Sequence, residues 1–201
     1  MGFRRTFFEF KPVSVATAAA MYVWFQGRLS LATFRDWRAR GESRPEPVPP
    51  AKLRFRVGGT FDEAGYVTSG QAIAQDIQNL CKATGHDFYS YSEVLDFGCG
   101  CGRVIQNFRG GNESCNLHAT DIDPDLVNWC KANLDGVDWH VNGHQPPLPF
   151  ADNAFDLVYA VSVFTHLDEE FQHAWLRELR RIARPGATLI LSVHGEHILQ
   201  G

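Results

Sequence analysis

Hydrophobic and polar positions along the chain follow two patterns, short apolar runs and apolar residues at helical spacing. The short runs predict buried strands of a parallel sheet over residues 94–97, 116–121, 137–141, 157–163 and 187–193. Apolar residues at helical spacing predict helices over residues 70–82, directly after residue 123, and over residues 169–183. Strands that alternate with helices predict an α/β fold, with a mostly parallel sheet flanked by helices.

The first of these strands leads into a loop with glycine at every second position. The strand ends at Asp96 and Phe97, and Gly98, Gly100 and Gly102 follow. Glycine is needed where a chain turns sharply and its backbone lies against a ligand, because a Cβ atom would intrude. A dinucleotide-binding fingerprint, G-x-G-x-x-G, would place its third glycine at position 103, which is Arg103. The loop therefore predicts a ligand that is not gripped through a pyrophosphate.

The order of residues in this loop resembles the first motif of the class I S-adenosylmethionine-dependent methyltransferases. Further segments match that family in the right order, namely Leu148-Pro-Phe150, Phe155-Asp-Leu-Val158 and Arg184-Pro-Gly186. The resemblance covers residues 70–193. It implies a Rossmann-like, doubly wound sheet whose seven strands have the order 3-2-1-4-5-7-6. It also implies S-adenosylmethionine as the cofactor, which has no phosphate but carries an ammonium, a carboxylate and a sulfonium group.

The resemblance implies which residues bind this cofactor. Asp121, at the end of the second strand, resembles the acid that accepts the two ribose hydroxyls, and Ile122 would pack on the adenine face. Alternatively, Asp121 is a second capping residue beside Asp123, the N-cap of the next helix. Many members of the family carry Gly-Asp near position 142, and this acid binds the adenine amino group. Here Asn142 stands in that region, so the resemblance implies that Asn142 or backbone atoms contact the adenine. The expected cofactor-binding residues are Asp96, Gly98, Cys99, Gly100, Gly102, Arg103, Asp121, Ile122, Asn142 and Ser162.

His166 is the candidate catalytic residue. It follows the predicted fourth strand, and ligands in open α/β sheets lie beyond the carboxyl ends of the strands, so residues 162–166 should face the methyl group. An imidazole with a pKa near neutrality can act as a general base on an acceptor hydroxyl or amine. Alternatively, Thr165-His-Leu-Asp168 is a capping box for the helix over residues 169–183, and His166 has no chemical role.

Composition and charge narrow the classes of partner. The chain has 201 residues and a net charge of −4, with 11 basic and 4 acidic residues in the first 60 and 8 basic and 19 acidic residues in the rest. An acidic body argues against a nucleic-acid partner. The five cysteines are odd in number and have no framework spacing, which indicates reduced thiols in a cytoplasmic protein. Cys99, Cys101 and His118 lack the spacing of a zinc site, so no metal is expected.

Residues 1–50 form a basic leader that ends in a proline-rich spacer, and residues 51–201 form the methyltransferase-like domain. The apolar stretch 13–25 is too short to span a bilayer, so it predicts a helix that packs on the domain. Weak contact with a membrane surface is the alternative. Arg35, Arg38, Arg40 and Arg44 continue the basic run, more typical of a solvated helix face. Residues 61–69 could close over the cofactor with Tyr66 as a lid, although simple packing of Tyr66 is the stronger interpretation.

The fifth predicted strand is apolar on both faces and lies eight residues from the last residue given. Strands six and seven of the family are missing, so we expect either a fragment or an edge covered by the N-terminal segment or by another copy of the chain.

The predicted function is methyl transfer from S-adenosylmethionine to a small-molecule oxygen, nitrogen or carbon atom, chiefly through in-line positioning. The alternative is a non-catalytic binding or scaffold module with the same fold. A nicotinamide oxidoreductase is disfavoured by Arg103.

Overall fold

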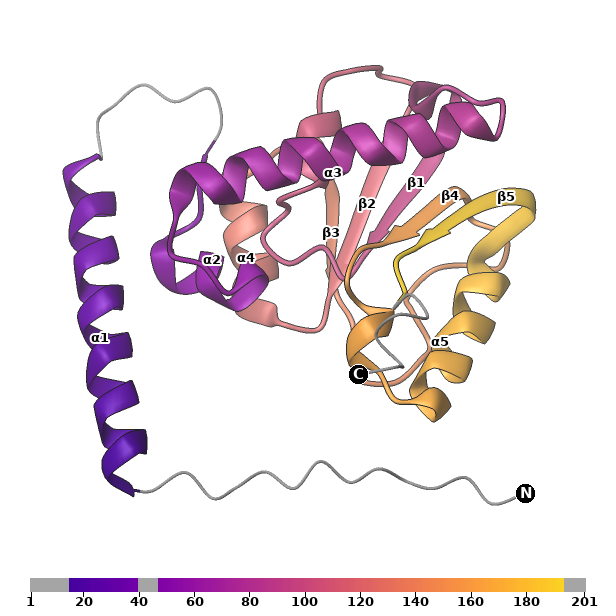
Figure 1. The fold of residues 1–201 in the computed structure, drawn as a ribbon. Coiled ribbons are helices and arrows are strands. Elements are labelled where there is room, and N and C mark those ends of the chain that lie inside the picture. The colour runs from indigo at the N-terminus through magenta and orange to yellow at the C-terminus, as the bar shows by residue number, and fades with distance from the viewer. Residues whose placement is uncertain (1–14, 40–46, 194–201) are drawn as a thin grey trace, which may run out of the picture. The chain divides into compact units, whose positions relative to one another are not determined.

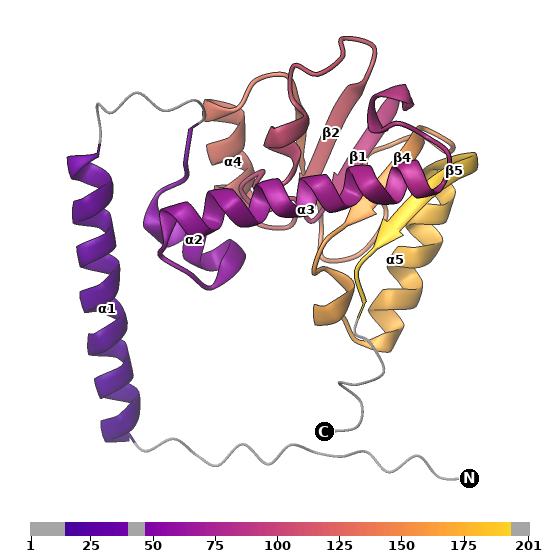
Figure 2. The same ribbon diagram turned by 45° about the horizontal axis from the view of Figure 1, so that its top comes forward.

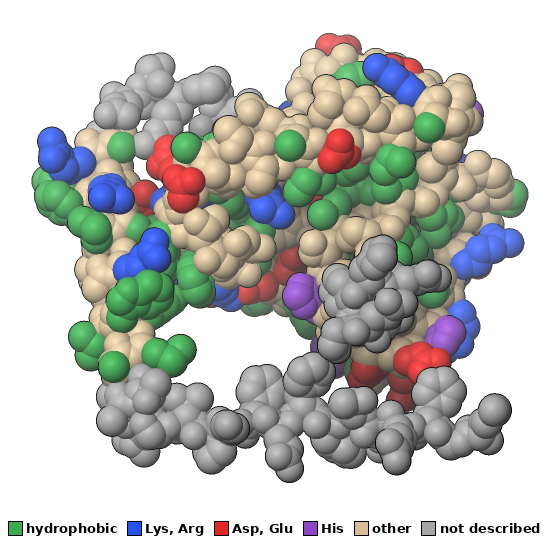
Figure 3. Space-filling view, viewed as in Figure 1, with side chains coloured by type: hydrophobic (Ala, Val, Ile, Leu, Met, Phe, Trp, Pro, Cys, Tyr) green, Lys and Arg blue, Asp and Glu red, His purple; other side chains and the backbone are tan. Residues whose placement is uncertain are grey.

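The computed structural model describes residues 15–39 and 47–193. The chain divides into two compact units, residues 1–42 and residues 43–201, and each is described by itself. In the first unit, α1 (Val15–Arg38) is a continuous helix of 24 residues, longer than the apolar stretch 13–25 that predicts it. Several of its large apolar side chains are exposed, among them Met21, Tyr22 and Trp24. Figure 3 shows hydrophobic side chains on the surface of this helix. No helix in the described ranges is both long and apolar enough to cross a membrane.

In its described part, residues 47–193, the second unit is built on a parallel sheet of five strands (Figure 1). The strands are β1 (Glu93–Phe97), β2 (Asn116–Asp121), β3 (Asp138–Val141), β4 (Phe155–Ala160) and β5 (Ala183–Leu191). Their order is β3-β2-β1-β4-β5, and every neighbouring pair is parallel. This is the Rossmann-like α/β fold that the sequence predicts. The order reverses between β1 and β4, and ligands of such sheets bind at this point, beyond the carboxyl ends of the strands.

Helices cover both faces of the sheet, as Figure 2 shows for α3 (Glu63–Ala83), which runs across the strands. Alternate residues of each strand point to opposite faces, and the buried side chains accordingly form two clusters. Val94 and Leu157 belong to the cluster under α3 and α4 (Pro124–Asn133), whereas Leu95 and Val158 belong to the cluster under α5 (Glu169–Ile182). The central strands are therefore buried on both faces, as their continuous apolar runs indicate.

Local sequence explains where several elements begin. Asp123 is the N-cap of α4, its side chain accepts a 3.0 Å hydrogen bond from the Asp125 amide, and Pro124 occupies the first turn, as predicted. The connections between the described strands and helices contain three short 3-10 helices: η1 (Phe88–Ser90), η2 (Ile105–Phe108) and η3 (Phe164–His166). The second of these lies shortly after the glycine loop, and Gly110-Gly111 follows it.

The boundaries of β4 and β5 differ from the prediction. β4 begins two residues earlier and ends at Ala160, because the chain turns at Ser162, whose φ is +59°. β5 begins at Ala183 rather than at residue 187. Ala183 pairs with Phe155, and the register then shifts, so that Thr188 pairs with Leu157. Pro185 is tolerated within β5 because β5 lies at the edge of the described sheet, where one side of the strand needs no partner.

The segment before β1 is more helical than predicted. Residues 53–57, where apolar residues alternate with arginine, lie in the helix α2 (Ala51–Gly58), which ends at Gly59 in a left-handed conformation. Residues 63–69 are the first two turns of α3 and not a separate closing segment. Tyr66 is only 1% exposed, and its hydroxyl donates a 3.3 Å hydrogen bond to the carbonyl of Cys101. Tyr66 therefore packs in the core beneath the glycine loop and is not a lid.

Candidate functional site

A cavity of about 860 Å³ opens at the carboxyl ends of β1, β2 and β4, and residues of α2 also line it. This volume lies in the upper part of the range for small-molecule sites. Ten of the eleven candidate residues from the sequence line the cavity: Asp96, Gly98, Cys99, Gly100, Arg103, Asp121, Ile122, Asn142, Ser162 and His166. The structure thus brings together residues that are up to 70 positions apart in the sequence.

Gly102 is the one candidate that does not line the cavity. Its φ is +69°, and a Cβ atom there would lie 2.8 Å from Cη2 of Trp139 and 2.9 Å from Cδ1 of Leu134. Those side chains belong to the buried cluster under α3 and α4. Gly102 therefore lets the loop pack closely on the core, and its part in the site is to position the loop.

Asp121 is held in place by backbone amides. Its Oδ2 accepts a 2.7 Å hydrogen bond from the amide of Gly100, and its Oδ1 accepts a 2.9 Å bond from the amide of Asp123. Burial raises the pKa of Asp121, and these amide bonds act in the opposite direction. Because each carboxylate oxygen has two acceptor sites, both oxygens can still accept a hydroxyl from the cavity. A vicinal diol matches this arrangement.

Asp96 is an acid buried directly under the loop. It is 3% exposed, and its Oδ2 has no hydrogen-bond partner among the described residues. Burial raises the pKa of Asp96 to about 8. The Tyr159 hydroxyl lies near enough to lower this pKa, although the two groups do not meet hydrogen-bond geometry, and the negative charge of Asp121 raises it further. A ligand cation beside Asp96 would favour its ionised form and relieve the burial of an unpaired acid.

Arg103 occupies the position where a dinucleotide fingerprint would have glycine. Its Nη1 donates a 3.2 Å hydrogen bond to Oγ of Ser69 on α3, and its Nε is buried without a hydrogen-bond partner among the described residues. A Cβ atom on Gly58 would lie 3.4 Å from the same Nη1. The guanidinium therefore lies between α2, α3 and the glycine loop, where it can meet an anionic group of a ligand.

Asn142 and Ile122 lie on the side of the cavity nearest β3. Asn142 is 8% exposed, its amide donates a 3.0 Å hydrogen bond to the carbonyl of Asp121, and its Oδ1 is buried without a hydrogen-bond partner among the described residues. A free carbonyl oxygen there can accept a hydrogen bond from an exocyclic amine. Ile122 is 52% exposed and lines the cavity, so it offers an apolar surface to a planar ring.

His166 and Ser162 line the opposite side of the cavity. The amide of Ser162 donates a 2.6 Å hydrogen bond to Oγ of Ser192, which fixes the turn after β4. The capping-box interpretation of residues 165–168 is wrong, because Asp168 is the N-cap of α5 and accepts a 3.0 Å bond from the amide of Phe171. His166 instead ends η3, two residues before that cap.

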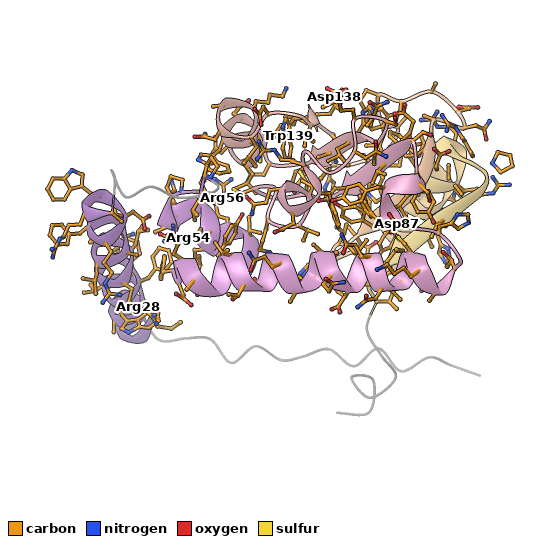
Figure 4. The ribbon with its side chains drawn as sticks, turned by 90° about the horizontal axis from the view of Figure 1, so that it is seen from above. Arg28, Arg54, Arg56, Asp87, Asp138 and Trp139 are labelled. Atoms are coloured by element: carbon orange, nitrogen blue, oxygen red, sulfur yellow. The ribbon has the colours of Figure 1, made fainter. Side chains whose placement is uncertain are left out.

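Sequence reasoning missed the residues that α2 contributes to the cavity, Phe55, Arg56, Val57 and Gly58. Arg56, which is labelled in Figure 4, lies on α2. It forms ion pairs with Asp123 and, at 2.9 Å, with Asp125 at the start of α4. The Gly58-Gly59 pair is a visible helix stop, but nothing in the local pattern places α2 over the glycine loop. His144 and Trp175 also line the cavity without having been predicted.

Comparison with known proteins agrees with this arrangement. Residues 95–191 match the family described as "Methyltransferase domain". The chain is 31% identical over 145 residues to malonyl-[acyl-carrier protein] O-methyltransferase of Hahella chejuensis. This match covers 67% of this chain and 51% of that protein. It is 32% identical over 159 residues to the ubiquinone/menaquinone biosynthesis C-methyltransferase of Roseobacter denitrificans, which covers 73% of this chain and 62% of that protein.

A solved structure from work on the conversion of a disulfide bond into a thioacetal group during echinomycin biosynthesis has a similar fold. The TM-score is 0.50 with 21% identity, over 62% of this chain and 52% of the other. This likeness concerns the fold alone. The chain spans about half of the length of the Hahella relative. The glycine loop, the strand order and the matches to curated methyltransferases agree, so the chain carries a class I S-adenosylmethionine-dependent methyltransferase domain.

Proposed function

We propose that this chain transfers a methyl group from S-adenosylmethionine to a small-molecule acceptor in the cavity beyond β1, β2 and β4. The observation that carries the proposal is the position of Asp121, which two backbone amides hold at the cavity wall beside the glycine loop. When bound, the cofactor supplies an already activated methyl group on a sulfonium. The protein therefore has to hold and align the two reactants and exclude water, with at most one proton to remove.

Each wall of the cavity suits one part of this cofactor. Asp121 accepts the ribose hydroxyls, and Asn142 Oδ1 accepts from the adenine amine while Ile122 packs on the ring. Asp96 and the loop carbonyls face the ammonium, and Arg103 faces the carboxylate. Gly98, Cys99, Gly100 and Ser162 line the remaining surface with backbone and small side chains.

His166 is our candidate for the general base, because it lines the cavity and ends a short helix outside any cap. His144 also lines the cavity, and its ring lies 4.8 Å from that of Phe171. We expect His166→Asn to lower the rate of methyl transfer about 100-fold or more while binding of the demethylated cofactor changes little. His173→Asn is the matched control, because His173 is 63% exposed on α5 and does not line the cavity. Equal rates in His166→Asn and the parent chain would remove His166 from the chemistry.

Titration calorimetry with S-adenosylmethionine and its demethylated product tests the cofactor assignment. We expect both to bind the parent chain, and Asp121→Ala to weaken both about tenfold or more, since it removes hydrogen bonds to a charged group. Asp135→Ala is the control, because Asp135 is 95% exposed and pairs with Arg109 away from the cavity. Unchanged affinity in Asp121→Ala would refute the ribose assignment, and an absence of binding to the parent chain would refute the proposed function.

The acceptor must be identified directly. Relatives are named for O-, C- and N-methyl transfer, so their names do not select an atom. Incubation with labelled cofactor and a cell extract, followed by identification of the methylated product, supplies the acceptor. Cofactor binding without transfer to any extract component would favour the alternative function, a binding or scaffold module that keeps the fold.

Three finer assignments accompany this function. All five cysteines are buried free thiols, which supports a reducing, cytoplasmic location. The exposed apolar and aromatic residues of α1, with Arg28 stacked 5.0 Å from the centroid of the Trp24 ring, support weak contact with a membrane surface, which flotation with anionic vesicles tests.

The edge position of β5 supports its covering by another copy of the chain. A monomer in ultracentrifugation whose β5 amides exchange rapidly would exclude that covering.

A further inference from the structure

The sheet carries a second group of chemically active side chains at the start of β2 and β3. His118 on β2 is paired in register with Asp138 on β3, and His140 lies two residues further along β3, so all three side chains share one face of the sheet. None of them lines the cofactor cavity. Figure 4 shows Asp138 at the periphery of the molecule and the next residue, Trp139, closer to the interior.

We infer that His118, Asp138 and His140 form a binding site for a divalent transition-metal ion of the zinc class. One ligand atom from each residue lies within 4.8 Å of the other two. Oδ2 of Asp138 lies 2.8 Å from Nε2 of His140 and 3.5 Å from Nδ1 of His118. Ligand atoms around a tetrahedral zinc ion at its usual bond lengths lie about 3.3 Å apart. Small side-chain shifts are therefore enough to place an ion between these three atoms.

The hydrogen bonds around His118 already select the nitrogen that would bind the ion. Nε2 of His118 lies 2.8 Å from Oε2 of Glu93, and Glu93 is held in turn by a 2.8 Å bond from Nδ2 of Asn116 to its Oε1. This leaves Nδ1 of His118 turned toward Asp138, buried and without a hydrogen bond among the described residues. A carboxylate that bonds the distal nitrogen of a metal-binding histidine is the usual supporting arrangement at zinc sites.

Aromatic packing fixes the two imidazole rings. The ring of Phe150 lies edge-on to both His118 and His140, at centroid distances of 6.0 and 5.0 Å, and Phe155 lies 5.2 Å from His118. The side chains of His118 and His140 are 19% and 29% exposed, whereas that of Asp138 is 60% exposed. The site is therefore rigid on its inner side and open to solvent on its outer side, where water could complete the coordination.

The ligand set indicates the class of ion. Two imidazoles and one carboxylate favour zinc, cobalt, nickel or copper over magnesium and calcium, which prefer oxygen ligands. The sequence predicts no metal, because that prediction considers Cys99, Cys101 and His118, whose spacing does not fit a zinc site. The two cysteines are buried in the glycine loop, whereas His118 is beside His140, which only the register of β2 and β3 could reveal.

Calorimetric titration of zinc into the chain, without a histidine tag and after removal of metals by a chelator, tests the site. We expect micromolar or tighter binding to the parent chain, and about 100-fold weaker binding to His140→Ala and Asp138→Asn. Glu93→Gln should lose about tenfold, since it removes only the support of His118. Cobalt should add visible absorption bands with the parent chain and not with these ligand variants.

His173→Ala is the matched control, because His173 is 63% exposed on α5 and pairs only loosely, at 3.8 Å, with Glu169. It should bind zinc as the parent chain does. Asp138→Asn changes an exposed side chain, so its fold should persist, which unchanged binding of demethylated cofactor would verify. Zinc affinity that is equal in the parent chain, His140→Ala and Asp138→Asn would overturn the site. Only millimolar affinity in the parent chain would overturn it too, leaving the three residues as a hydrogen-bonded group.

Discussion

The amide of Gly100 donates a 2.7 Å hydrogen bond to Oδ2 of Asp121, which joins the loop after β1 to the tip of β2. The loop is also tied to β2 by the amides of Gly98 and Cys99, which both donate to the carbonyl of Thr120. These bonds fix the wall of the cavity before any ligand enters. Such preorganisation lowers the entropy that a ligand would otherwise lose in ordering the loop.

Gly100→Ala should weaken cofactor binding and destabilise the domain. The φ of Gly100 is +56°, and a Cβ atom there would lie 2.9 Å from Cγ2 of Val57 on α2. The variant therefore adds about 1–2 kcal/mol of backbone strain and also pushes α2 away from the loop. Thermal unfolding and calorimetry with the demethylated cofactor would measure the two effects.

Gly110→Ala separates strain from collision, because Gly110 has a similar φ of +70° but no atom within 4 Å of the place that a Cβ would occupy. It should lose stability by the strain alone and keep its cofactor affinity. Adding Val57→Ala to Gly100→Ala should restore part of the lost affinity. If Gly100→Ala and Gly110→Ala change stability and cofactor affinity to the same extent, the contact between α2 and the loop contributes to neither.

Cofactor affinity should depend on pH through Asp96. Burial raises its pKa to about 8, so the free protein holds a proton there at pH 7. The ammonium of the cofactor favours the carboxylate, so binding should release a proton, and affinity should increase as pH rises toward 8. Calorimetry in buffers of different ionisation enthalpy counts the protons. Asp96→Asn should bind more weakly and release none at this site, and proton release equal to that of the parent chain would assign it elsewhere.

The carboxyl group of Asp96 also makes the stability of the ligand-free protein depend on pH, in the direction opposite to that of cofactor affinity. Between the unfolded pKa of about 3.9 and the folded pKa of about 8, the folded state holds a proton that the unfolded state has lost. The free energy of unfolding of the ligand-free protein should therefore fall as pH rises through this window. Asp96→Asn should lack this contribution, and urea unfolding at pH 5 and pH 8 would reveal the difference in slope.

Arg56→Gln should speed the release of cofactor. Arg56 links α2 to Asp123 and Asp125 at the start of α4, beside the cavity. This pair of bonds is partly exposed, so we expect a loss of about 1 kcal/mol or less and a dissociation rate up to about fivefold higher. Stopped-flow measurement at low and high salt would test it, since salt should reduce the difference. Arg109→Gln, whose partner Asp135 lies outside the cavity, should not change the rate.

The strand pattern and the loop chemistry were readable from sequence because they depend on neighbouring residues. The apolar run before Asp96, the alternating glycines and the Asp123-Pro124 helix start are local features, and the structure has each of them as predicted. The cluster of His118 and His140 was not readable, because it depends on how two strands align.

Two differences between the prediction and the structure, the start of β5 and the position of α2, have the same physical origin. The sequence predicts that β5 begins after Pro185, because proline usually interrupts a strand. β5 begins earlier because it lies at the edge of the sheet, where proline is acceptable within a strand. The sequence does not indicate that α2 lies over the glycine loop, because the contact between Val57 and Gly100 joins residues more than 40 positions apart. Helical and strand periods describe a residue's immediate neighbours, and long-range packing decides which of them meet.

Glu178 on α5 holds the segment Leu148-Pro-Phe150 in place. It is 6% exposed, and its Oε1 accepts a 2.7 Å bond from the amide of Leu148 and a 2.6 Å bond from Nη2 of Arg181. Arg181 also donates to the carbonyl of Phe150 at 3.0 Å. Phe150 contacts both histidines of the proposed metal site, so this network supports that face of the sheet as well.

Glu178→Gln should therefore lower the free energy of unfolding at pH 7 by about 1.5–3 kcal/mol, the usual worth of hydrogen bonds to a charged group. The bonds with Arg181 lower the pKa of Glu178, so its contribution is present above the unfolded pKa of about 4.3 and is lost as pH falls through the folded pKa. Urea unfolding at pH 7 and pH 3.5 should show a difference that shrinks with acid. Glu169→Gln, at a side chain 92% exposed, should show none. A constant difference at both pH values would mean that packing, and not charge, is the contribution of Glu178.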